Sequence, residues 1–348
     1  MDPLLRLISA AHLTAILERT GLLNDRRVQE VTIISDRPTL LSRIIRLRLT
    51  YDGPANALPG SLIVKTGHPE REWTVGSKEV AFYGDVAPSL PAGLVPCCFE
   101  AHHADATTPW YLFLEDLTET HAVATEWPLP PSDAQCRTII GSLGRFHAAW
   151  WEDKRLGVTI GERPDDAAID EIIRLLVGHF DVFADCLGDE LSGERRVFYQ
   201  RLIAAAPRLL RNARNRPNFT LRHGDANVWN CFLPRNGGND VRWFDWDGWC
   251  IGVPTNDLAY MMAVHWYPER RQRLEQALLD HYHTVLLENG VPNYNRTDMQ
   301  EDYRRSVLWQ TITPVFQAGL KLPPVGWWNN FQHIMAAVDD LGCRELLD

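Results

Sequence analysis

The segment from Leu221 to Asp257 constrains the fold of this chain more than any other. Two short apolar runs, 231–233 and 241–244, flank a turn-rich stretch from Pro234 to Asp240. Residues 235–239, with the sequence RNGGN, tolerate the positive φ angles of tight turns, so we expect a β-hairpin here. Because a hairpin brings its two ends side by side, the polar residues that flank both strands should converge on one point.

The converging side chains suit a metal ion and a phosphate. They offer carboxylates, amides and an imidazole: His223, Asp225, Asn227, Asn230, Asp245 and Asp247. Carboxylate and amide oxygens suit Mg²⁺, which completes its shell with water and phosphate. An Asp, an Asn five residues later, a hairpin and a second Asp form the order found in kinase catalytic and metal-binding loops. The alternative is that Asp and Asn here only cap turns, and the spacing of Asp225, Asn230 and Asp245 argues against it.

The amino-acid sequences of these motifs resemble those of one superfamily of small-molecule kinases. The strings HGDANVWN and DWD resemble the aminoglycoside phosphotransferase and choline kinase superfamily. HGDANVWN and the upstream string SKEVAFYGDVAP are most similar to its ecdysteroid-kinase-like branch. The resemblance implies that Asp225 accepts the proton of a substrate hydroxyl, and that Asn230 and Asp245 hold Mg²⁺ on ATP. Asp247 is a candidate second carboxylate ligand.

The resemblance also implies an α+β fold of the two-lobed protein-kinase type. Residues 1–117 should form an N-lobe with an antiparallel β-sheet, and residues 118–348 a mainly helical C-lobe that carries the hairpin. The N-terminal third fits this expectation, because apolar residues recur at helical spacing up to Leu17 after an Asp2-Pro3 start. Three β-like runs follow at 28–35, 42–51 and 61–66.

Lys65 ends the apolar run 62–64, where an unmatched charge is costly. In the kinase interpretation, it reaches the nucleotide phosphates and pairs with a glutamate of the next helix. Residues 76–86 are predicted to be that helix and Glu79 the partner, ahead of Glu70 and Glu72. The alternative is a solvated charge at a strand edge.

The predicted nucleotide site has two further parts, a phosphate-binding turn that differs from that of protein kinases and a hinge that is assigned from its position in the chain. The turn at 35–42 has no glycine, so a serine-bearing loop would contact phosphate. Ser35, Thr39 and Ser42 are the candidates, and Arg43 lies nearby. The strand WYLFLEDL, 110–117, corresponds to the hinge, where backbone groups near Glu115 and Leu117 would bind adenine.

Beyond the hinge, the chain is predicted to be largely helical, with helices at 132–151, 167–187 and 190–215. The resemblance makes His147 a packing residue and gives Asp257 the task of bracing the catalytic loop. Aromatic residues are frequent after Trp266, which favours an aromatic acceptor cavity next to Asp225.

Composition excludes several other classes of protein. The net charge is −10 and the sequence has no basic block, which argues against a nucleic-acid partner. A membrane-spanning apolar run and a signal peptide are also missing, and the 7 cysteines have no CxxC spacing. We therefore expect a cytoplasmic protein with reduced thiols that does not bind membranes; the sequence leaves the oligomeric state open.

Together these features predict an ATP- and Mg²⁺-dependent phosphotransferase that acts on the hydroxyl of a small molecule. The acceptor could be a metabolite, a secondary metabolite or an antibiotic. The direct passage from Gly248 to Asp257 leaves no room for a protein-kinase activation loop and favours a small acceptor. The alternatives are a non-catalytic kinase-like nucleotide-binding protein and a metal-dependent hydrolase.

Overall fold

The chain divides into two compact units in a computed structural model that describes residues 7–348 except 24, 40, 56 and 69–75. The first unit comprises Met1–Val123 and Cys231–Trp249, and the second Ala124–Asn230 and Cys250–Asp348. The predicted boundary at residue 117 assigned the hairpin to the C-lobe, whereas here its strands group with the N-terminal residues.

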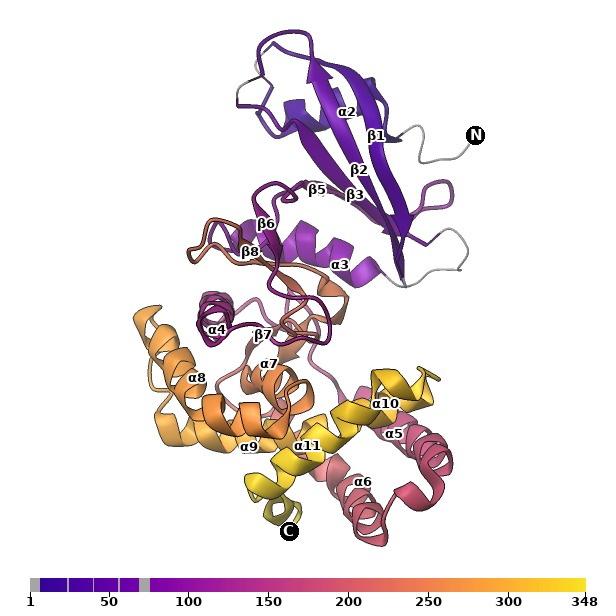
Figure 1. The fold of residues 1–348 in the computed structure, drawn as a ribbon, viewed down its shortest axis with the longest axis vertical. Helices are drawn as coiled ribbons and strands as arrows, with labels where there is room; N and C mark the ends of the chain where they lie inside the picture. The colour runs from indigo at the N-terminus through magenta and orange to yellow at the C-terminus, as the bar shows by residue number, and fades with distance from the viewer. Residues whose placement is uncertain (1–6, 24, 40, 56, 69–75) are drawn as a thin grey trace. The chain divides into compact units, whose positions relative to one another are not determined.

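A five-stranded antiparallel sheet forms the body of the first unit (Figure 1). Its strands, in spatial order, are β1 (Val28–Pro38), β2 (Ser42–Tyr51), β3 (Ser61–Gly67), β5 (Tyr111–Glu115) and β4 (Cys98–His102). Helix α2 (Ala10–Arg19) covers one face, and its Leu13, Ile16 and Leu17 share a core with apolar residues of β2 and β3. The three predicted strands are therefore present, and alternation along β2 buries every second residue near its middle.

One sequence-based boundary in this unit was wrong, and another lies outside the described residues. The predicted start of the first helix lies outside the described residues, and α2 itself begins at Ala10 after Ser9, whose hydroxyl accepts a bond of 3.3 Å from the His12 N–H. Strand β1 continues to Pro38 instead of ending at Ser35, because Pro38 still pairs with Arg43 of β2. The loop between these strands is therefore shorter than predicted.

The helix predicted at 76–86 is present in two parts. Helix α3 (Ser77–Ala81) continues as a π-helical turn (Phe82–Val86) and a 3₁₀ turn (Ala87–Ser89). Gly76 precedes it with φ of 102°, and an added Cβ there would lie 2.2 Å from the Trp110 ring. Only glycine fits this entry to the helix without displacing the indole.

The predicted hairpin forms and belongs to a small three-stranded sheet. Strand β8 (Cys231–Pro234) lies between β9 (Arg242–Trp243) and β6 (His121–Val123). Gly237 and Gly238 in its turn have positive φ, as predicted. After β9, Trp246 stacks on Phe82 with ring centroids 3.8 Å apart. Pairing with β6 and this stacking explain why the hairpin groups with the first unit.

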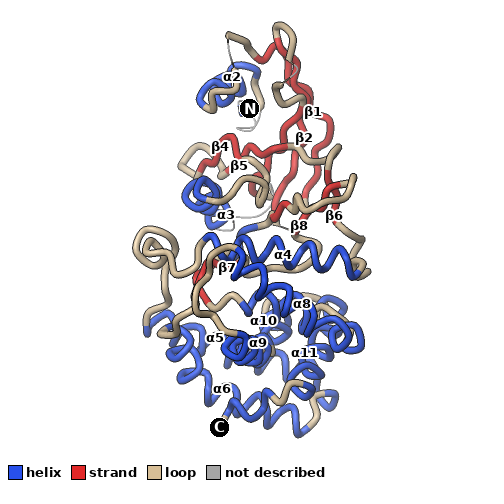
Figure 2. The backbone as a smooth tube through the Cα atoms, turned by 90° about the vertical axis from the view of Figure 1, so that its left-hand side faces the viewer, coloured by secondary structure: helices blue, strands red, loops and turns tan. Residues whose placement is uncertain are grey.

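The second unit is mainly helical, as the blue segments of Figure 2 show. Its helices are α4 (Asp133–Ala149), α5 (Asp166–Leu187), α6 (Gly193–Arg214), α7 (Thr255–Ala259), α8 (Pro268–Glu288), α9 (Arg296–Gln310), α10 (Ile312–Gly319) and α11 (Trp328–Asp340). A π-helical turn (Tyr260–Val264) extends α7, and β7 (Thr220–Arg222) pairs with β10 (Cys250–Gly252). The helices predicted at 132–151, 167–187 and 190–215 correspond to α4, α5 and α6.

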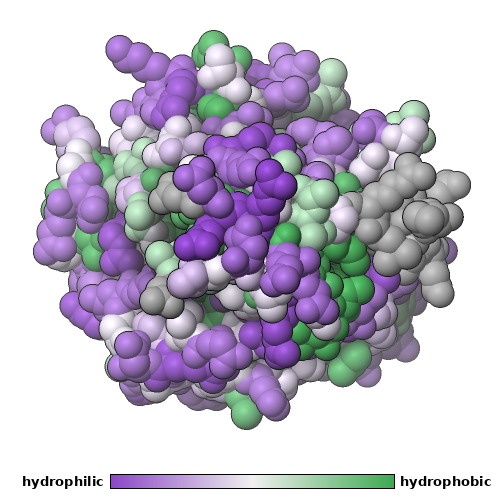
Figure 3. Space-filling view, turned by 90° about the horizontal axis from the view of Figure 1, so that it is seen from above, coloured by the Kyte–Doolittle hydropathy of each residue, from purple (hydrophilic) through white to green (hydrophobic). Residues whose placement is uncertain are grey.

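Hydrophilic side chains predominate on the face shown in Figure 3, where hydrophobic ones form smaller groups. Within the described part of the chain, none of the helices combines the length and apolarity needed to cross a membrane.

Candidate active site

Lys65 lies at the centre of a buried charge cluster in the first unit. Its Nζ is 2.6 Å from Oε2 of Glu79 and 2.8 Å from Oδ1 of Asp245. Burial disfavours the charged ammonium, but the two carboxylates outweigh this effect and raise the pKa of Lys65. The ion pair of Lys65 with Glu79 that the sequence predicted is thus present; the less favoured partners, Glu70 and Glu72, lie outside the described residues.

Glu79 also fixes the backbone that follows Asp245. Its Oε1 accepts a hydrogen bond of 3.4 Å from the Trp246 N–H. Asp245 itself has a left-handed backbone with φ of 66° and ψ of 65°, which costs a residue other than glycine about 1–2 kcal/mol. The contacts of Glu79 and the Phe82–Trp246 stack compensate for this cost, so the Asp245 carboxylate is turned toward Lys65.

Three carboxylates of the first unit could hold a divalent cation. One ligand atom each from Glu79, Asp245 and Asp247 lies within 4.8 Å of the others. Burial raises the pKa of Asp247, against the influence of Lys65. Three carboxylates against one ammonium leave a formal charge of −2 in a largely buried cluster. Hard oxygen donors with an excess of negative charge fit Mg²⁺.

The loop of Asp225 in the second unit is built from hydrogen bonds between neighbours. Asn227 and Asn230 donate from Nδ2 to the Asp225 carboxylate, at 3.1 Å to Oδ1 and 2.7 Å to Oδ2. The Tyr260 hydroxyl also bonds to this carboxylate. Burial, followed by the charge and hydrogen bond of Asp225, raises the pKa of Tyr260 well above 10.0. The carboxylate is half-buried and oriented on both oxygens.

Asp257 holds the backbone of the same loop. Its Oδ2 accepts from the His223 N–H at 2.7 Å and its Oδ1 from the Gly224 N–H at 3.1 Å. His147 completes the arrangement, since Nε2 is 3.2 Å from Asp257 and Nδ1 is 2.7 Å from the Tyr282 hydroxyl. The predicted brace is therefore present and His147 is a packing residue. Asp257 does not cap α7, which begins at Thr255 after Pro254.

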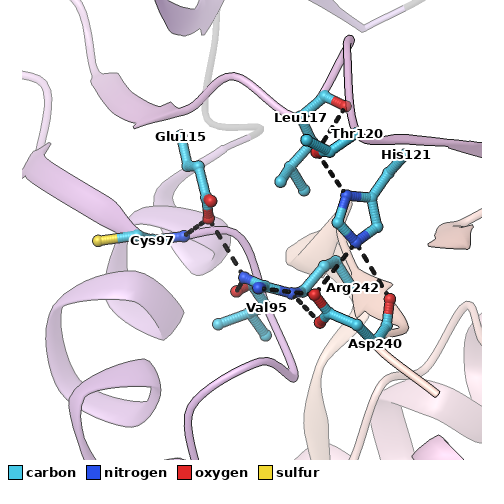
Figure 4. Close-up of polar contacts among 8 residues, drawn as sticks. All are labelled: Val95, Cys97, Glu115, Leu117, Thr120, His121, Asp240 and Arg242. Carbon is cyan, nitrogen blue, oxygen red and sulfur yellow. Dashed lines mark hydrogen bonds and ion pairs between the residues drawn. The ribbon is translucent and has the colours of Figure 1, made fainter. Parts of the chain in front are cut away.

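The residues predicted for the hinge lie at the end of β5 (Figure 4). The Glu115 carboxylate accepts from the Cys97 N–H at 3.1 Å and from Arg242 at 3.2 Å. The Leu117 carbonyl accepts from the His121 N–H at 2.8 Å. This carbonyl is committed to the turn, so an adenine contact at Leu117 would use its N–H.

The glycine-free turn is closed by its own side chains. Ser42 is buried, and its Oγ is 2.9 Å from Oγ1 of Thr39. Arg43 forms a bidentate pair with Asp36, at 2.8 and 2.6 Å. These contacts shape the turn, while Leu40 lies outside the described residues.

A small aromatic cavity in the second unit lies next to the Asp225 loop. It measures about 30 Å³ and is lined by Trp127, Pro128, Trp229, His265, Tyr267, Val325, Gly326, Asn329, Asn330 and His333. His265 connects it to Asp225: its Nδ1 is 2.9 Å from the Tyr260 carbonyl. Burial lowers the pKa of His265, against the opposing influence of Tyr260 and of the Asp225 charge. The lining contains no Asp or Glu, in agreement with the aromatic cavity that the sequence predicted.

Sequence reasoning missed several of these residues. Tyr260, His265 and Trp127 were not singled out as site residues, and the tryptophans from Trp266 onward divide between the core and the cavity walls. Trp327 is 1% exposed and belongs to the core. The only available signal for Tyr260 was its place three residues after Asp257, one helical turn away.

The comparisons with known proteins agree with the fold. Similar solved structures include a mutant aminoglycoside 2'-phosphotransferase IIIa with GDP (14% identity, 97% of this chain and 99% of that chain, TM-score 0.53). The choline kinase LicA from Streptococcus pneumoniae is also similar (15% identity, 95% of this chain and 99% of that chain, TM-score 0.51). An ethanolamine kinase from Plasmodium vivax is a third similar structure (14% identity, 95% of this chain and 87% of that chain, TM-score 0.52). No curated protein matches the sequence significantly.

These neighbours are phosphotransferases, and the chain has their α+β, two-lobed kinase-like fold. The sequence profile of the ecdysteroid kinase-like family matches residues 39–290, more than half of the 348 residues. The protein therefore belongs to the ecdysteroid kinase-like family.

Proposed function

We propose that the protein transfers the γ-phosphate of ATP to a hydroxyl group of a small molecule, in a reaction that requires Mg²⁺. The observation that carries the proposal is the position of Lys65, whose Nζ is within 2.8 Å of both Glu79 and Asp245. A buried ammonium held by two acids is suited to bind phosphate oxygens, which would share its charge when a nucleotide is present.

Each polar residue of the site has a task in this proposal. Lys65 binds phosphate oxygens while Glu79 orients its ammonium. Asp245 and Asp247, with Asn230 as a further ligand through its amide oxygen, would hold Mg²⁺, which supplies charge neutralisation on the phosphates. Asp225 accepts the hydroxyl proton and orients the oxygen for in-line attack. Phosphoryl transfer needs mainly positioning and charge stabilisation from the protein.

Two groups position Asp225 for this role. The amides of Asn227 and Asn230 orient its carboxylate, and Asp257 fixes the backbone before it. The hinge residues Glu115 and Leu117 would bind adenine through their backbone. Ser42 can contact a phosphate only if its hydroxyl gives up the hydrogen bond to the Thr39 hydroxyl and bonds to the phosphate instead.

The aromatic cavity next to the Asp225 loop is our proposed acceptor site. At about 30 Å³ it has room for about one water molecule, so an acceptor has to displace side chains. Trp127 and Tyr267 are 60% and 51% exposed, so we expect these two side chains to be the ones that an acceptor displaces. A lining of rings without acids favours an alcohol with an apolar or ring-like body over a polycationic sugar.

The alternatives predict different binding behaviour. A non-catalytic nucleotide-binding protein would bind ATP without releasing ADP, and a metal-dependent hydrolase using His223 and Asp225 would not need Lys65. The intact cluster around Lys65 favours the kinase. Catalysis with ATP also agrees with the cytoplasmic location that we infer from the sequence.

The test is ADP release from Mg-ATP with a panel of alcohols, with the product mass measured. An acceptor should give a product heavier by one phosphate. Asp225→Asn should reduce turnover at least about 100-fold, the scale of general base catalysis, while ATP binding is retained. Asp185→Asn, an exposed residue of α5, is the matched control. Near-normal turnover of Asp225→Asn would remove the proposed base.

A further inference from the structure

A second and much larger cavity lies in the second unit, apart from the aromatic one. It measures about 430 Å³ and shares no lining residue with the first. Its walls come from helices α5 and α6 and the residues that flank them, from strands β7 and β10, and from helices α7, α9 and α10. A cavity of this size is in the range that holds a small organic ligand.

Guanidinium groups dominate the polar part of its lining. Six arginines contribute: Arg163, Arg208, Arg214, Arg216, Arg222 and Arg305. The single lining carboxylate is Asp302, which is buried and already bound by Arg216 and by the Tyr294 hydroxyl at 3.1 Å. The cavity thus carries a strong positive excess in a protein whose net charge is −10.

Three of these arginines make their direct contacts with groups other than carboxylates. Arg163 lies 3.7 Å from the centroid of the Phe219 ring, and Arg208 donates to the Leu347 carbonyl at 3.1 Å. Arg222 donates from Nη2 to Sγ of Cys250 at 2.9 Å, and its buried Nε has no acceptor. Within the described ranges, none of these three has a carboxylate in ion-pair range. Arg208 is exposed, and Arg163 and Arg222 are partly buried. Against the effect of burial, Cys250 and the more distant charge of Asp257 raise the pKa of Arg222. These guanidinium groups can therefore donate charge-assisted hydrogen bonds to an anion that enters the cavity.

The remaining walls are apolar side chains that are only partly buried by the protein itself. Ile172 of α5, Ile251 and Val253 around β10, and Trp309, Ile312 and Phe316 of α9 and α10 line the cavity. Apolar surface left open in a concave site favours an apolar ligand body, at about 25 cal/mol per Å² removed from water. The arginines therefore favour a negatively charged head group, and the apolar walls favour a hydrophobic body in the same ligand.

We propose that this cavity binds an amphipathic anion: an apolar chain or ring system with a carboxylate or phosphate head group that is bound by the arginines. Arg222 is the central contact in this proposal, because its buried Nε is left without an acceptor. Its guanidinium lies against Gly252, another residue of the cavity wall, where an added Cβ would be 2.6 Å from Nε. The ligand would sit on strand β7, which leads directly into the loop of Asp225, and beside Asn256, the neighbour of the bracing Asp257.

Calorimetric titration of the whole protein without nucleotide tests the proposal. Dodecanoate and dodecyl phosphate are the anionic probes. Three compounds serve as controls: dodecanol has the chain without a charge, dodecyltrimethylammonium has the chain with a positive charge, and acetate has the carboxylate without the chain. We expect saturable binding of one or both anions and at least tenfold weaker binding of the other three. Stronger binding of one anion identifies the head group. Equal binding of the cation or the alcohol, or no binding of either anion, would overturn the proposal.

Two variants connect binding to this cavity. Arg222→Gln removes the central cation, and Ala213→Trp places a large ring into the cavity from an exposed position of α6. Each should weaken binding of the anion at least tenfold. Arg201→Gln, on the same helix but outside the cavity, should bind as the wild type does. If Arg222→Gln does not fold, Ala213→Trp still decides, and unchanged binding by Ala213→Trp contradicts the proposed location. Because no nucleotide is present, these results do not depend on kinase activity.

Discussion

At the scale of single residues, Lys65 and Glu79 depend on one another. Both are nearly fully buried, at 8% and 1% exposure, and a buried charge that loses its partner typically costs about 3–5 kcal/mol. Their contribution to folding and their contribution to nucleotide binding must therefore be separated by experiment.

We expect Lys65→Met to weaken ATP binding at least tenfold and to lower the Tm, because Glu79 loses its counter-charge. The double variant Lys65→Met/Glu79→Gln should recover most of the Tm but not the ATP affinity. Lys78→Met, an exposed lysine of the same region, serves as control. Calorimetric titration and thermal unfolding measure the two effects, and full ATP affinity in Lys65→Met would exclude the proposed phosphate contact.

Two histidines of the aromatic cavity should make stability depend on pH. Burial lowers the pKa of His265 and of His333 below the usual 6.5. The unfolded chain therefore binds protons more readily, and the stabilisation that is complete above pH 6.5 is lost as the pH falls through the lower pKa of the folded state.

We expect the Tm to fall between pH 7.5 and 5.5, and to fall less in the variant His265→Gln/His333→Gln. His103→Gln, an exposed histidine, should behave as the wild type. Acids whose pKa is raised, such as Asp247, act in the opposite direction, so the difference between variants carries the result. An identical pH dependence in the double variant would show that these imidazoles do not contribute.

At the scale of elements, the entry to α3 positions the whole cluster. Gly76 has a positive φ and lies against the Trp110 indole, and Glu79 follows within the first turn. The position of the Glu79 carboxylate thus depends on a backbone conformation that only glycine adopts easily.

Gly76→Ala should destabilise the protein by about 1–3 kcal/mol, the cost of a strained backbone position, and weaken ATP binding as well. The matched control is Gly84→Ala, because Gly84 lies in the adjoining π-helical turn with open space around its Cα and no positive φ. Chemical denaturation compares the two variants, and equal stability would contradict the packing argument.

At the scale of the whole molecule, binding of Mg-ATP should raise the apparent Tm, because a ligand that binds only the folded state stabilises it by about 2.7 kcal/mol at 100 times its dissociation constant. ATP with EDTA should give a smaller shift. Asp245→Ala should reduce the Mg-ATP shift more than Asp247→Ala, since Asp245 also contacts Lys65 at 2.8 Å. The reverse order would make Asp247 the main ligand, and a shift from Mg²⁺ alone with no added effect of ATP would favour the hydrolase.

The local order of the chain was readable from the sequence alone. Turn residues and short apolar runs predicted the hairpin, and helical spacing predicted α4, α5 and α6, because backbone preferences and the solvent exposure of each face act over a few residues. The spacing of Asp225, Asn230 and Asp245 indicated candidate catalytic and metal-binding residues, and that assignment stays a prediction. The segment ends were less accurate, as the extension of β1 to Pro38 demonstrates.

Only the tertiary structure decided which distant residues meet. The packing of α3 against the turn after β9 selected Glu79 to bond both Lys65 and the Trp246 N–H. The contact of His147 with Asp257 and Tyr282 spans 110 and 135 residues. The arginine cavity joins residues from 163 to 316. Periodicity shows which face of an element is buried, but the partner of that face is set by how all apolar faces pack together, and no local pattern encodes that choice.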